Sequence, residues 1–378
     1  MPTMQPYLPK ELPIKELNYG ELFSLGIRAS SALARFDGLL NGLVNPSVLM
    51  GPLSVQEAQF SSRIEDIYAT IEDVLTQGAG GHLGEKNVDE QLDILEIINY
   101  RATLESSQHA ISEGGEIDLH LIRAMHQTLM EGARGSDKSP GEFRKDQNWI
   151  APKGCTIEDA IFVPVSPFEL DSALKSLIQY VQYDDMDHIA QAGILHAQFE
   201  LIHPFRDGNG RVGRLLIPLF LYYKKQLSLP MFYISGYLEK NRKEYLDRLA
   251  MLSSTNDWHG WLTFFYSAVI EQSEVNAVKV QQLMSLYEDT KEKVRIVANS
   301  KYSDAMTDAL FQGAIFSIPQ LVRTTSIPKP SIVQLLAKLE KADIVKVYTE
   351  GAGTKAKTYF FPELLIATSE MSIVNNNK

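Results

Sequence analysis

The chain has 378 residues, 44% of them hydrophobic and 22% charged, a composition that indicates a folded globular protein of two or three domains and excludes a disordered chain. Its formal net charge of -11 argues against a surface that binds nucleic acid non-specifically over its whole extent. The single cysteine, Cys155, excludes an intramolecular disulfide framework and a structural zinc site built on cysteines.

The N-terminal segment "MPTMQPYLPKELPIKEL" lacks the basic and then apolar layout of a secretory signal. Its prolines predict an extended arm to about residue 15. The longest apolar run, "LLIPLFLYY", is far shorter than the roughly 20 residues that a membrane helix needs. We therefore expect a cytoplasmic protein that makes no membrane contact.

The region that follows the arm is predicted to be helical. Apolar residues recur at three-to-four spacing over 21–43 and again over 54–77, which is the pattern of amphipathic helices. Ser54 is the predicted N-cap of the second helix, with Glu57 as its capping-box partner. A glycine-rich loop is predicted at 78–87.

The middle of the chain is predicted to be helical around one extended segment. Further helices are predicted at 88–112, 117–132, 168–182 and 186–203. The stretch 149–167 instead carries prolines, a glycine and the short β-type run "AIFV". This stretch therefore predicts a hairpin or an extended flap.

From Asp304 the pattern changes. Three short helices are followed by two β-rich runs that flank a Gly/Lys turn, a layout typical of a winged helix-turn-helix. The polar tail 368–378 is expected to fray. The predicted organisation is a helical region over 1–112, a central core over 113–270 and a winged-helix domain over 285–378.

The segment "IHPFRDGNGRVGR" concentrates polar residues between two apolar helices. The first helix is predicted to end near Pro204 and the second to begin just after Gly210, so "RDGNG" is a tight loop. Gly208 and Gly210 permit positive φ. Backbone N–H groups of such a loop, with the N-terminus of the next helix, form an anion-binding site.

Several side chains of this segment suit polyphosphate chemistry. Asn209 tolerates the loop conformation and can donate from its amide, while Arg211 and Arg214 add planar guanidinium groups that match phosphate. Asp207 beside a phosphate site is placed to share a magnesium ion, which takes only one or two protein ligands. His203, with a reference pKa near ~6.5, could accept a proton from an incoming hydroxyl.

This segment resembles the signature of the Fic family, His-x-Phe-x-Asp/Glu-Gly-Asn-Gly-Arg-x-x-Arg, at every defined position. "PGEFRKDQNWI" and "AIFVP" resemble the segment before the family's flap and the flap itself. The resemblance runs from about residue 7 through the C-terminal winged helix. It implies a mainly α-helical Fic core with a small β-hairpin flap, an N-terminal inhibitory helix and a C-terminal winged helix-turn-helix.

The resemblance also implies an activity, namely transfer of AMP from ATP to a Ser, Thr or Tyr hydroxyl of a protein, with release of pyrophosphate. By resemblance, His203 is the general base, Asp207 holds Mg²⁺ and Arg214 faces the γ-phosphate. The residues that cradle the other phosphates are Gly208, Asn209, Gly210 and Arg211. The implied partners are ATP, a protein target, this chain itself as a target, and a second copy in a homodimer.

Two further sets of residues carry weaker resemblances. The flap, Asp159 to Val163, would pair with the target's main chain by strand addition, although an ordinary edge strand fits the same pattern. Its candidate contact residues are Ile161, Phe162 and Val163. Tyr245 and Asn256 resemble positions that line the adenine pocket, with core packing or a helix cap as the alternative for each.

The stretch "SSRIED" resembles the family's inhibitory motif, Ser/Thr-x-x-x-Glu-Gly/Asn. Ser61 and Glu65 lie four residues apart, on one helix face. By resemblance, Glu65 would pair with Arg214 and keep the γ-phosphate from its productive position. Asp66 departs from the motif, which has Gly or Asn there, so the sequence leaves open whether the helix continues.

Three alternative interpretations remain. His196, Glu200 and His203 stand at helical spacings that could converge on a metal, as in a metallohydrolase, although the glycine-rich loop would then have no role. "GAGTKAKT" at 351–358 lacks the ending of a phosphate loop and fits a wing turn. A DNA-binding regulator, with a Fic core that uses another nucleotide or removes AMP, is the third.

The DNA-binding alternative depends on local charge. Between residues 318 and 360 there are seven basic side chains and three acidic ones, so this segment carries 7 minus 3, or +4, in an acidic chain. Winged helices also serve as protein-docking modules, so the charge excess alone does not decide between DNA and protein partners.

Overall fold

The computed structural model describes residues 5–42, 46–151, 156–351, 353 and 355–373, so Cys155 lies outside the described residues. The chain folds into two compact units. Unit 1 combines residues 1–37 with 99–274, and unit 2 combines residues 38–98 with 275–378. Each unit joins two separate stretches of the chain, whereas the three domains predicted from the sequence are consecutive stretches. The two divisions therefore do not correspond, and the three-domain organisation stays a prediction.

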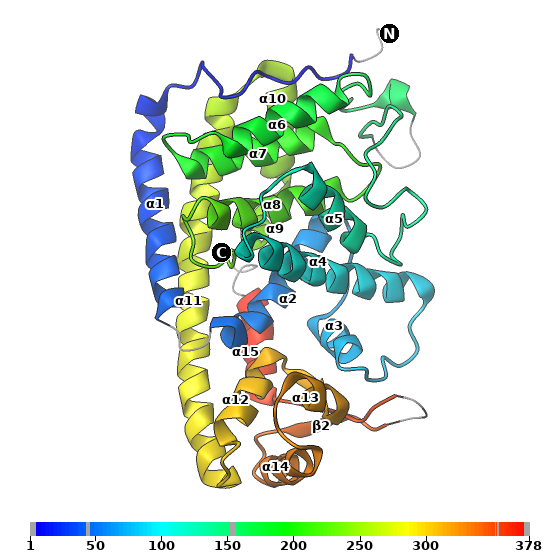
Figure 1. Cartoon of the computed structure of the whole chain (residues 1–378), viewed down its shortest axis with the longest axis vertical. Coiled ribbons are helices and arrows are strands. Elements are labelled where there is room, and N and C mark those ends of the chain that lie inside the picture. The colour runs from blue at the N-terminus through cyan, green and yellow to red at the C-terminus, as the bar shows by residue number, and fades with distance from the viewer. Residues whose placement is uncertain (1–4, 43–45, 152–155, 352, 354, 374–378) are drawn as a thin grey trace. The chain divides into compact units, whose positions relative to one another are not determined.

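The described chain is mainly helical, as predicted (Figure 1). Three helices contribute residues to both units. These helices are α1 (Tyr19–Asn41), α4 (Val88–Ser112) and α11 (Trp258–Ala298). The predicted helix at 88–112 is confirmed with the bounds expected from its apolar spacing. Over the described residues, no helix combines the length and the apolar character needed to cross a bilayer.

Unit 1 is built from helices. They are α5 (Leu119–Leu129), α6 (Leu170–Gln182), α7 (His188–Ile202), α8 (Asn209–Tyr223), α9 (Ser235–Lys240) and α10 (Arg242–Thr255), with the short 3-10 turn η1 at Ile157–Asp159. The helices predicted at 117–132, 168–182 and 186–203 are α5, α6 and α7, so these predictions are confirmed with small shifts at the ends.

Helix α7 is the central element of unit 1 and packs against α6, α8 and α10 (Figure 1). It is buried on every side, since all of its residues from Ile189 to Ile202 except Glu200 are buried. Asp187 caps its start, because Oδ1 accepts the backbone amides of Ile189 and Ala190 at 2.8 and 3.0 Å. A helix that is capped and buried in this way gives rigid support to the residues at its C-terminal end.

Unit 2 combines helices with a small sheet. Its helices are α2 (Pro46–Ile64), α3 (Ile71–Gly78), α12 (Ser303–Gln312), α13 (Ile318–Thr324), α14 (Lys329–Lys341) and α15 (Pro362–Ile373). Its strands are β1 (Ile315–Ser317), β2 (Lys346–Thr349) and β3 (Thr358–Phe360), paired antiparallel in the order β1-β3-β2. Tyr359 of β3 stands opposite both Phe316 and Val347.

The C-terminal elements match part of the predicted layout. The three predicted short helices are α12, α13 and α14, and the two β-rich runs are β2 and β3, whereas β1 was not predicted. The tail is helical as far as Ile373, so the prediction that it frays from residue 368 is wrong for the residues up to there. The winged-helix assignment stays a prediction.

The start of α2 corrects the predicted N-cap. The helix begins at Pro46, so Ser54 lies in its interior and its hydroxyl donates to the Gly51 carbonyl at 2.7 Å. The upstream residues Val48 and Leu53 are buried, with exposed fractions of 1% and 3%. Their burial extends the core-facing side of the helix toward the N-terminus, and so the helix starts before the Ser-x-x-Glu pattern.

The predicted helix 54–77 is two helices. α2 ends at Ile64, and Asp66 has a φ of 59°, a left-handed conformation that α-helical geometry does not accommodate. The next helix, α3, begins at Ile71 with Thr70 as its N-cap. Apolar periodicity continues across the break, which is why spacing alone predicts one helix.

Candidate active site

The polar segment between α7 and α8 forms a tight loop, but its bounds differ from the predicted 206–210. Asn209 and Gly210 already belong to α8, so of the two glycines only Gly208 takes a positive φ. α7 ends at Ile202, and His203 takes the left-handed conformation with a φ of 51°. Gly208, with a φ of 74°, is the N-cap of α8. The six residues from 203 to 208 therefore turn the chain from the end of one buried helix into the start of the next.

His203 is held in one tautomer by the end of α7. Its Nδ1 lies 3.2 Å from the Glu200 carbonyl oxygen, which can only accept, so Nδ1 carries the hydrogen and donates it. Nε2 therefore holds the lone pair in the neutral ring. The imidazole is half-buried, so the structure presents a base at the rim of the loop.

Asn209 closes the loop with its side chain. Its Oδ1 accepts the Phe205 amide at 2.8 Å, and its Nδ2 donates to the Phe205 carbonyl at 2.9 Å. The side chain is buried, so both of its polar ends are used within the loop. The backbone amides at the start of α8 have no acceptor within the helix, which leaves the N-terminus of α8 as the anion-binding feature.

Asp207 accepts a hydrogen bond at each carboxylate oxygen. Oδ1 accepts the Gly208 amide at 2.7 Å, and Oδ2 accepts from Nζ of Lys138 at 2.9 Å. Burial alone would raise the pKa of the Asp207 carboxyl, but the Lys138 hydrogen bond and the charges of Lys138 and Arg211 lower it below its usual value. Asp207 is therefore a carboxylate at neutral pH.

The role of Asp207 as a magnesium ligand stays a prediction, which its surroundings constrain. The Lys138 ammonium already places a cation against Oδ2. Gly135 keeps a side chain away from that oxygen, since a Cβ there would lie 3.1 Å from Oδ2 and 2.8 Å from Met130 Cε. Across the described residues, no three His, Cys, Asp or Glu side chains converge, so phosphate oxygens would have to complete the coordination.

His126 contacts the 203–208 loop at Phe205 and Asp207, and the sequence analysis did not identify it. Its ring stacks on Phe205 with centroids 3.8 Å apart, and its Nε2 lies 3.1 Å from the Asp207 carbonyl oxygen. Its Nδ1 accepts the Gly141 amide at 2.8 Å. Burial lowers the pKa of His126 to about 4, so the ring is neutral and its two nitrogens have fixed, opposite roles.

Replacing His126 with phenylalanine should destabilise unit 1 by about 2 kcal/mol, because it keeps the stacked ring but leaves two partly buried backbone groups, the Asp207 carbonyl and the Gly141 amide, without this partner. All three tryptophans, Trp149, Trp258 and Trp261, lie in unit 1, so their fluorescence during urea unfolding measures this change. His120→Phe, at an exposed position of α5, is the control and should change stability by less than about 0.5 kcal/mol. Equal effects of the two variants would contradict the assigned role of His126.

Arg144 joins the end of α7 to the segment that follows the flap, and it too was missed. The side chain is buried, with 3% exposed, and burial lowers its pKa to about 10, which still leaves it charged. Nε donates to the His203 carbonyl at 2.9 Å, and one terminal nitrogen donates to the carbonyls of Ile202, at 3.2 Å, and Val165. The other terminal nitrogen donates to the Asp146 carbonyl at 3.1 Å. The sequence signal was its place in "PGEFRKDQNWI", which identified the segment but not the residue.

The two arginines of the signature are buried. Arg211 and Arg214 have exposed fractions of 3% and 1%. Burial and the nearby charge of Arg214 lower the pKa of His196 to about 3, so His196 is neutral. Its Nε2 hydrogen-bonds the Tyr245 hydroxyl at 2.9 Å. His196 is thus a core residue, and the described residues contain no cluster of the kind that a metallohydrolase needs.

Tyr245 packs in the core and Asn256 ends a helix, which are the structural roles given as alternatives to adenine binding. Tyr245 is buried and packs among the rings of His196, Trp261 and Phe264. Asn256 is exposed and ends α10 in the left-handed conformation, with a φ of 56°. Their roles as adenine contacts stay a prediction.

The flap is a short β-bridge. Ile150 and Phe162 exchange backbone hydrogen bonds of 2.8 and 3.2 Å. The side chain of Ile161 is 61% exposed, whereas Val163 is buried. On the other side, the Tyr7 amide donates to the Val163 carbonyl at 2.9 Å, so the N-terminal arm joins the end of the flap.

The stretch that resembles the inhibitory motif lies at the end of α2. Ser61 is buried, while Glu65 follows the helix as an exposed residue whose amide donates to the Ser62 carbonyl at 3.0 Å. Asp66 takes the left-handed conformation, which Gly and Asn adopt most readily, so the departure at Asp66 does not prevent the turn. Glu65 belongs to unit 2 and Arg214 to unit 1, and their pairing stays a prediction.

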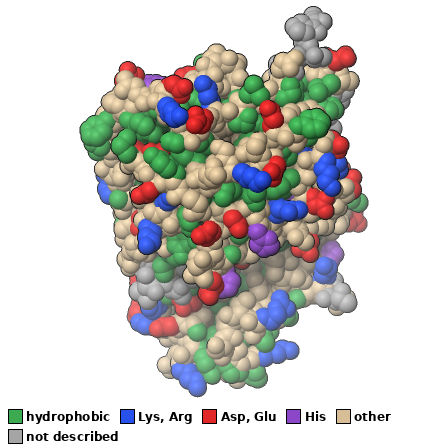
Figure 2. All heavy atoms as spheres, turned by 45° about the horizontal axis from the view of Figure 1, so that its top comes forward, with side chains coloured by type: hydrophobic (Ala, Val, Ile, Leu, Met, Phe, Trp, Pro, Cys, Tyr) green, Lys and Arg blue, Asp and Glu red, His purple; other side chains and the backbone are tan. Residues whose placement is uncertain are grey.

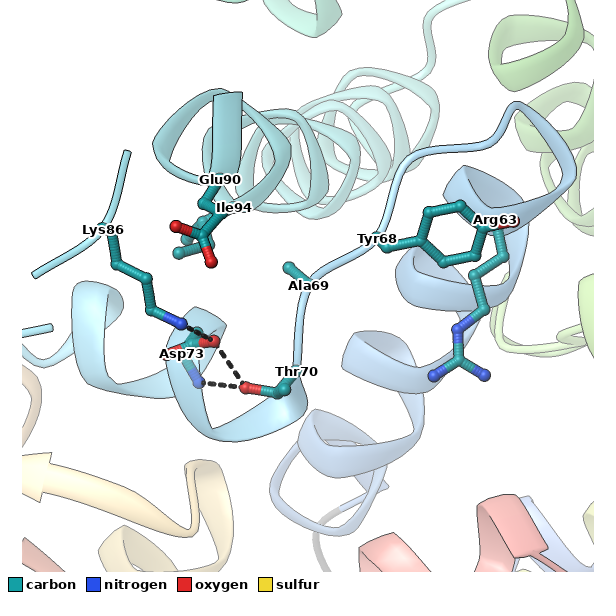
Figure 3. Close-up of a pocket in the computed structure, with 8 residues that line it drawn as sticks. All are labelled: Arg63, Tyr68, Ala69, Thr70, Asp73, Lys86, Glu90 and Ile94. Carbon is teal, nitrogen blue, oxygen red and sulfur yellow. Dashed lines mark hydrogen bonds and ion pairs between the residues drawn. The ribbon is translucent and has the colours of Figure 1, made fainter. Parts of the chain in front are cut away.

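A cavity of about 270 Å³ lies beside this turn in unit 2 (Figure 3). Its lining residues are Arg63, Tyr68, Ala69, Thr70, Asp73, Lys86, Glu90 and Ile94. Asp73 accepts from Nζ of Lys86 at 2.9 Å and from Oγ1 of Thr70 at 2.7 Å, while Figure 3 shows Arg63 and Tyr68 on the opposite side. The ion pair ties the glycine-rich loop to α3 and so braces the segment that follows Glu65.

Charge on the C-terminal segment is partly neutralised within unit 2. Of its seven basic residues, Lys338 donates to a backbone carbonyl, and Lys346 and Lys357 pair with neighbouring carboxylates. Over the upper and middle part of the face in Figure 2, acidic and basic side chains are interspersed, whereas its lower end shows Lys and Arg side chains without acidic ones. The net charge of +4 already counts the two paired carboxylates, so these pairings leave that excess unchanged.

Known structures share this fold. A Fic family protein from Desulfovibrio desulfuricans matches with a TM-score of 0.59 at 18% identity, over 95% of this chain and 98% of that chain. Fic-1 from Caenorhabditis elegans, residues 134–508, matches with a TM-score of 0.54 at 19% identity, over 72% of this chain and 75% of that chain. The fold is therefore that of Fic proteins.

Sequence comparison identifies the family. Residues 116–221 match the model of the Fic/DOC family, and residues 23–109 match that of the Fic/DOC family N-terminal region. A probable protein adenylyltransferase of Aquifex aeolicus is 26% identical over 209 residues, 52% of this chain and 54% of that protein. Protein adenylyltransferase fic-1 of C. elegans is 31% identical over 112 residues, 29% of this chain and 20% of that protein.

The chain belongs to the Fic/DOC family. The matches span about half the length of the Aquifex relative and about a fifth of the worm relative, 54% and 20% respectively.

Proposed function

We propose that this chain is a protein adenylyltransferase, which transfers AMP from ATP to a Ser, Thr or Tyr hydroxyl of a protein. The observation that carries the proposal is the loop from 203 to 208, which places a base, a carboxylate and a helix N-terminus next to one another. The naming of the Aquifex and Caenorhabditis relatives as adenylyltransferases supports the choice of AMP.

His203 and the loop act on opposite sides of the reacting phosphorus. Nε2 of His203 takes the proton of the acceptor hydroxyl as its oxygen bonds to the α-phosphorus. The bond from the α-phosphorus to the bridging oxygen breaks, and pyrophosphate leaves with that electron pair. The amides at the start of α8 bind the phosphate oxygens, so the protein mainly positions an in-line attack and neutralises charge.

Asp207 would hold a magnesium ion with the phosphates. When bound, the ion neutralises charge on the polyphosphate and orients it. Arg211 and Arg214 are buried, and by the resemblance their guanidinium groups would bind the phosphates. The flap would align the target by strand addition, with the exposed Ile161 as a contact for its side chains.

Intact mass measurement after incubation with ATP and Mg²⁺ tests the activity. Self-modification should add the mass of one AMP group, whereas a kinase would add a phosphate and an inactive protein would keep its mass. A parallel incubation with a candidate target detects transfer in trans. Addition of a phosphate, or of another nucleotide group supplied alongside ATP, would overturn the proposed chemistry.

We further infer that Glu65 limits this activity by competing with the γ-phosphate for Arg214. A charge-assisted pair of this kind is worth about 1.5–3 kcal/mol, so Glu65→Gly should raise self-modification by about ten- to a hundredfold, measured with α-labelled ATP. Glu85→Gly, at an exposed site in the glycine-rich loop, is the matched control. An equal rise in both variants, or in neither, would contradict the inhibitory role.

The DNA-binding alternative concerns the C-terminal segment and would add to catalysis. The local charge of +4, from seven basic and three acidic residues over 318–360, is the observation that favours it. A salt-dependent mobility shift by the full chain, lost when Lys341 and Lys355 are replaced, would support it.

The homodimer expected from the resemblance stays a prediction that light scattering can test.

A further inference from the structure

Lys138 contacts Asp207 across 69 positions of the chain. It is brought there by a compact turn after α5, in which the amide of Ser136 donates to the Ala133 carbonyl at 3.1 Å and that of Lys138 to the Gly135 carbonyl at 2.8 Å. Gly135 takes a φ of 81° in this turn. The backbone therefore delivers Lys138 to the carboxylate, so its position does not depend on a flexible side chain alone.

The ammonium contacts one of the two carboxylate oxygens of Asp207. Oδ1 is engaged by the amide of Gly208, which belongs to the loop itself, whereas Oδ2 points toward the turn that carries Gly135 and Lys138. A divalent cation at Oδ2 would share that oxygen with the ammonium. Two cations at one oxygen repel each other, so the metal and Lys138 compete for Asp207.

We propose that Lys138 is the resident counter-ion of Asp207 and makes metal loading depend on nucleotide, so that the divalent cation enters together with the polyphosphate. The inference rests on the proposed function, because it takes Asp207 as the metal ligand. The phosphates supply the negative charge that the metal needs in addition to one carboxylate. The four-carbon side chain of Lys138 lets its ammonium leave Oδ2 without moving the turn.

The competition is modest because the contact is open to solvent. The side chains of Lys138 and Asp207 are 47% and 37% exposed, and exposed ion pairs are weakened by water and salt. Removal of the Lys138 charge should therefore tighten metal binding to the nucleotide-free protein by about three- to fivefold. With a bound nucleotide the same change should have little effect, since the ammonium has already left Oδ2.

Mn²⁺ titration of the full chain tests the competition between Lys138 and the metal without an activity assay. The electron paramagnetic resonance signal of free Mn²⁺ reports how much remains unbound. Lys138→Met should bind Mn²⁺ about three- to fivefold more tightly than the unmodified protein when no nucleotide is present. Lys145→Met removes an exposed lysine a little further along the chain and controls for net charge. With a non-hydrolysable ATP analogue, the three proteins should bind Mn²⁺ about equally.

The proposal would be overturned if, without nucleotide, Lys138→Met bound Mn²⁺ no more tightly than Lys145→Met does. A gain from Lys138→Met that persists undiminished with the ATP analogue would also overturn it, because the ammonium would then not leave on nucleotide binding. Mn²⁺ binding by Asp207→Asn distinguishes failure of the Lys138 proposal from failure of the proposed function. If nucleotide-dependent Mn²⁺ binding survives Asp207→Asn, the metal does not use Asp207, and the metal part of the proposed function fails as well.

Discussion

His203→Ala is expected to reduce AMP transfer by about a hundred- to ten-thousandfold while leaving ATP binding nearly unchanged, because a positioned general base contributes to the transition state of proton transfer and not to phosphate binding. The structure gives a specific reason for this separation. Nδ1 is committed to the Glu200 carbonyl, so the reactive lone pair is on Nε2, and the amides of α8 that would bind phosphate belong to a different part of the loop.

Initial rates with α-labelled ATP, and separate titration with a fluorescent ATP analogue, check the two halves of this prediction. His120→Ala, at an exposed position of α5, controls for loss of an imidazole elsewhere in unit 1. A variant that loses transfer and nucleotide binding together would place His203 among the phosphate ligands. Transfer within a few-fold of the unmodified protein would contradict the role of general base.

The local chemistry of this site could be predicted because it is continuous in sequence. Residues 203 to 214 carry the base, the carboxylate, the glycines and both arginines in one segment, and the flanking apolar runs specify the two helices. Gly208 at positive φ follows from that pattern, whereas α8 begins at Asn209, earlier than the start predicted just after Gly210. The same contiguity made the end of α7 predictable.

The supports of the site could not be predicted because they come from elsewhere in the chain. His126 and Lys138 reach Asp207 from more than sixty positions away, at separations of 81 and 69. Neither residue has a local pattern that distinguishes it from an ordinary helix histidine or a surface lysine. Asn209 shows the opposite case, since its position was predicted but its side chain closes the loop instead of extending toward a ligand.

Breaks in regular structure were also missed where periodicity continues through them. The apolar pattern runs from α2 into α3, yet the left-handed Asp66 separates the two helices. Aspartate tolerates that conformation through its short polar side chain, but it does so less often than glycine and gives a weaker signal. Local conformation at one residue thus decides whether the segment after Glu65 is a continuous helix.

Arg144→Lys is expected to destabilise unit 1 by about 2–4 kcal/mol and to slow transfer by about a hundredfold, although the substitution keeps the positive charge. The guanidinium donates to four backbone carbonyls, those of Asp146, Val165, Ile202 and His203. A lysine ammonium is a compact donor that cannot reach all four from one position. At least two buried carbonyls would therefore lose their partner at the point where α7 ends.

The effect on activity should exceed what unfolding alone explains, because the His203 carbonyl is one of the four acceptors and fixes the left-handed backbone that carries the base. Tryptophan fluorescence in urea gives the stability of unit 1, and transfer rates measured well below the unfolding transition give the second effect. Arg206→Lys is the matched control, since Arg206 lies on the same loop but pairs with Asp146 at the surface. If Arg144→Lys lowered stability but left the transfer rate of the folded protein unchanged, Arg144 would stabilise unit 1 without positioning the base.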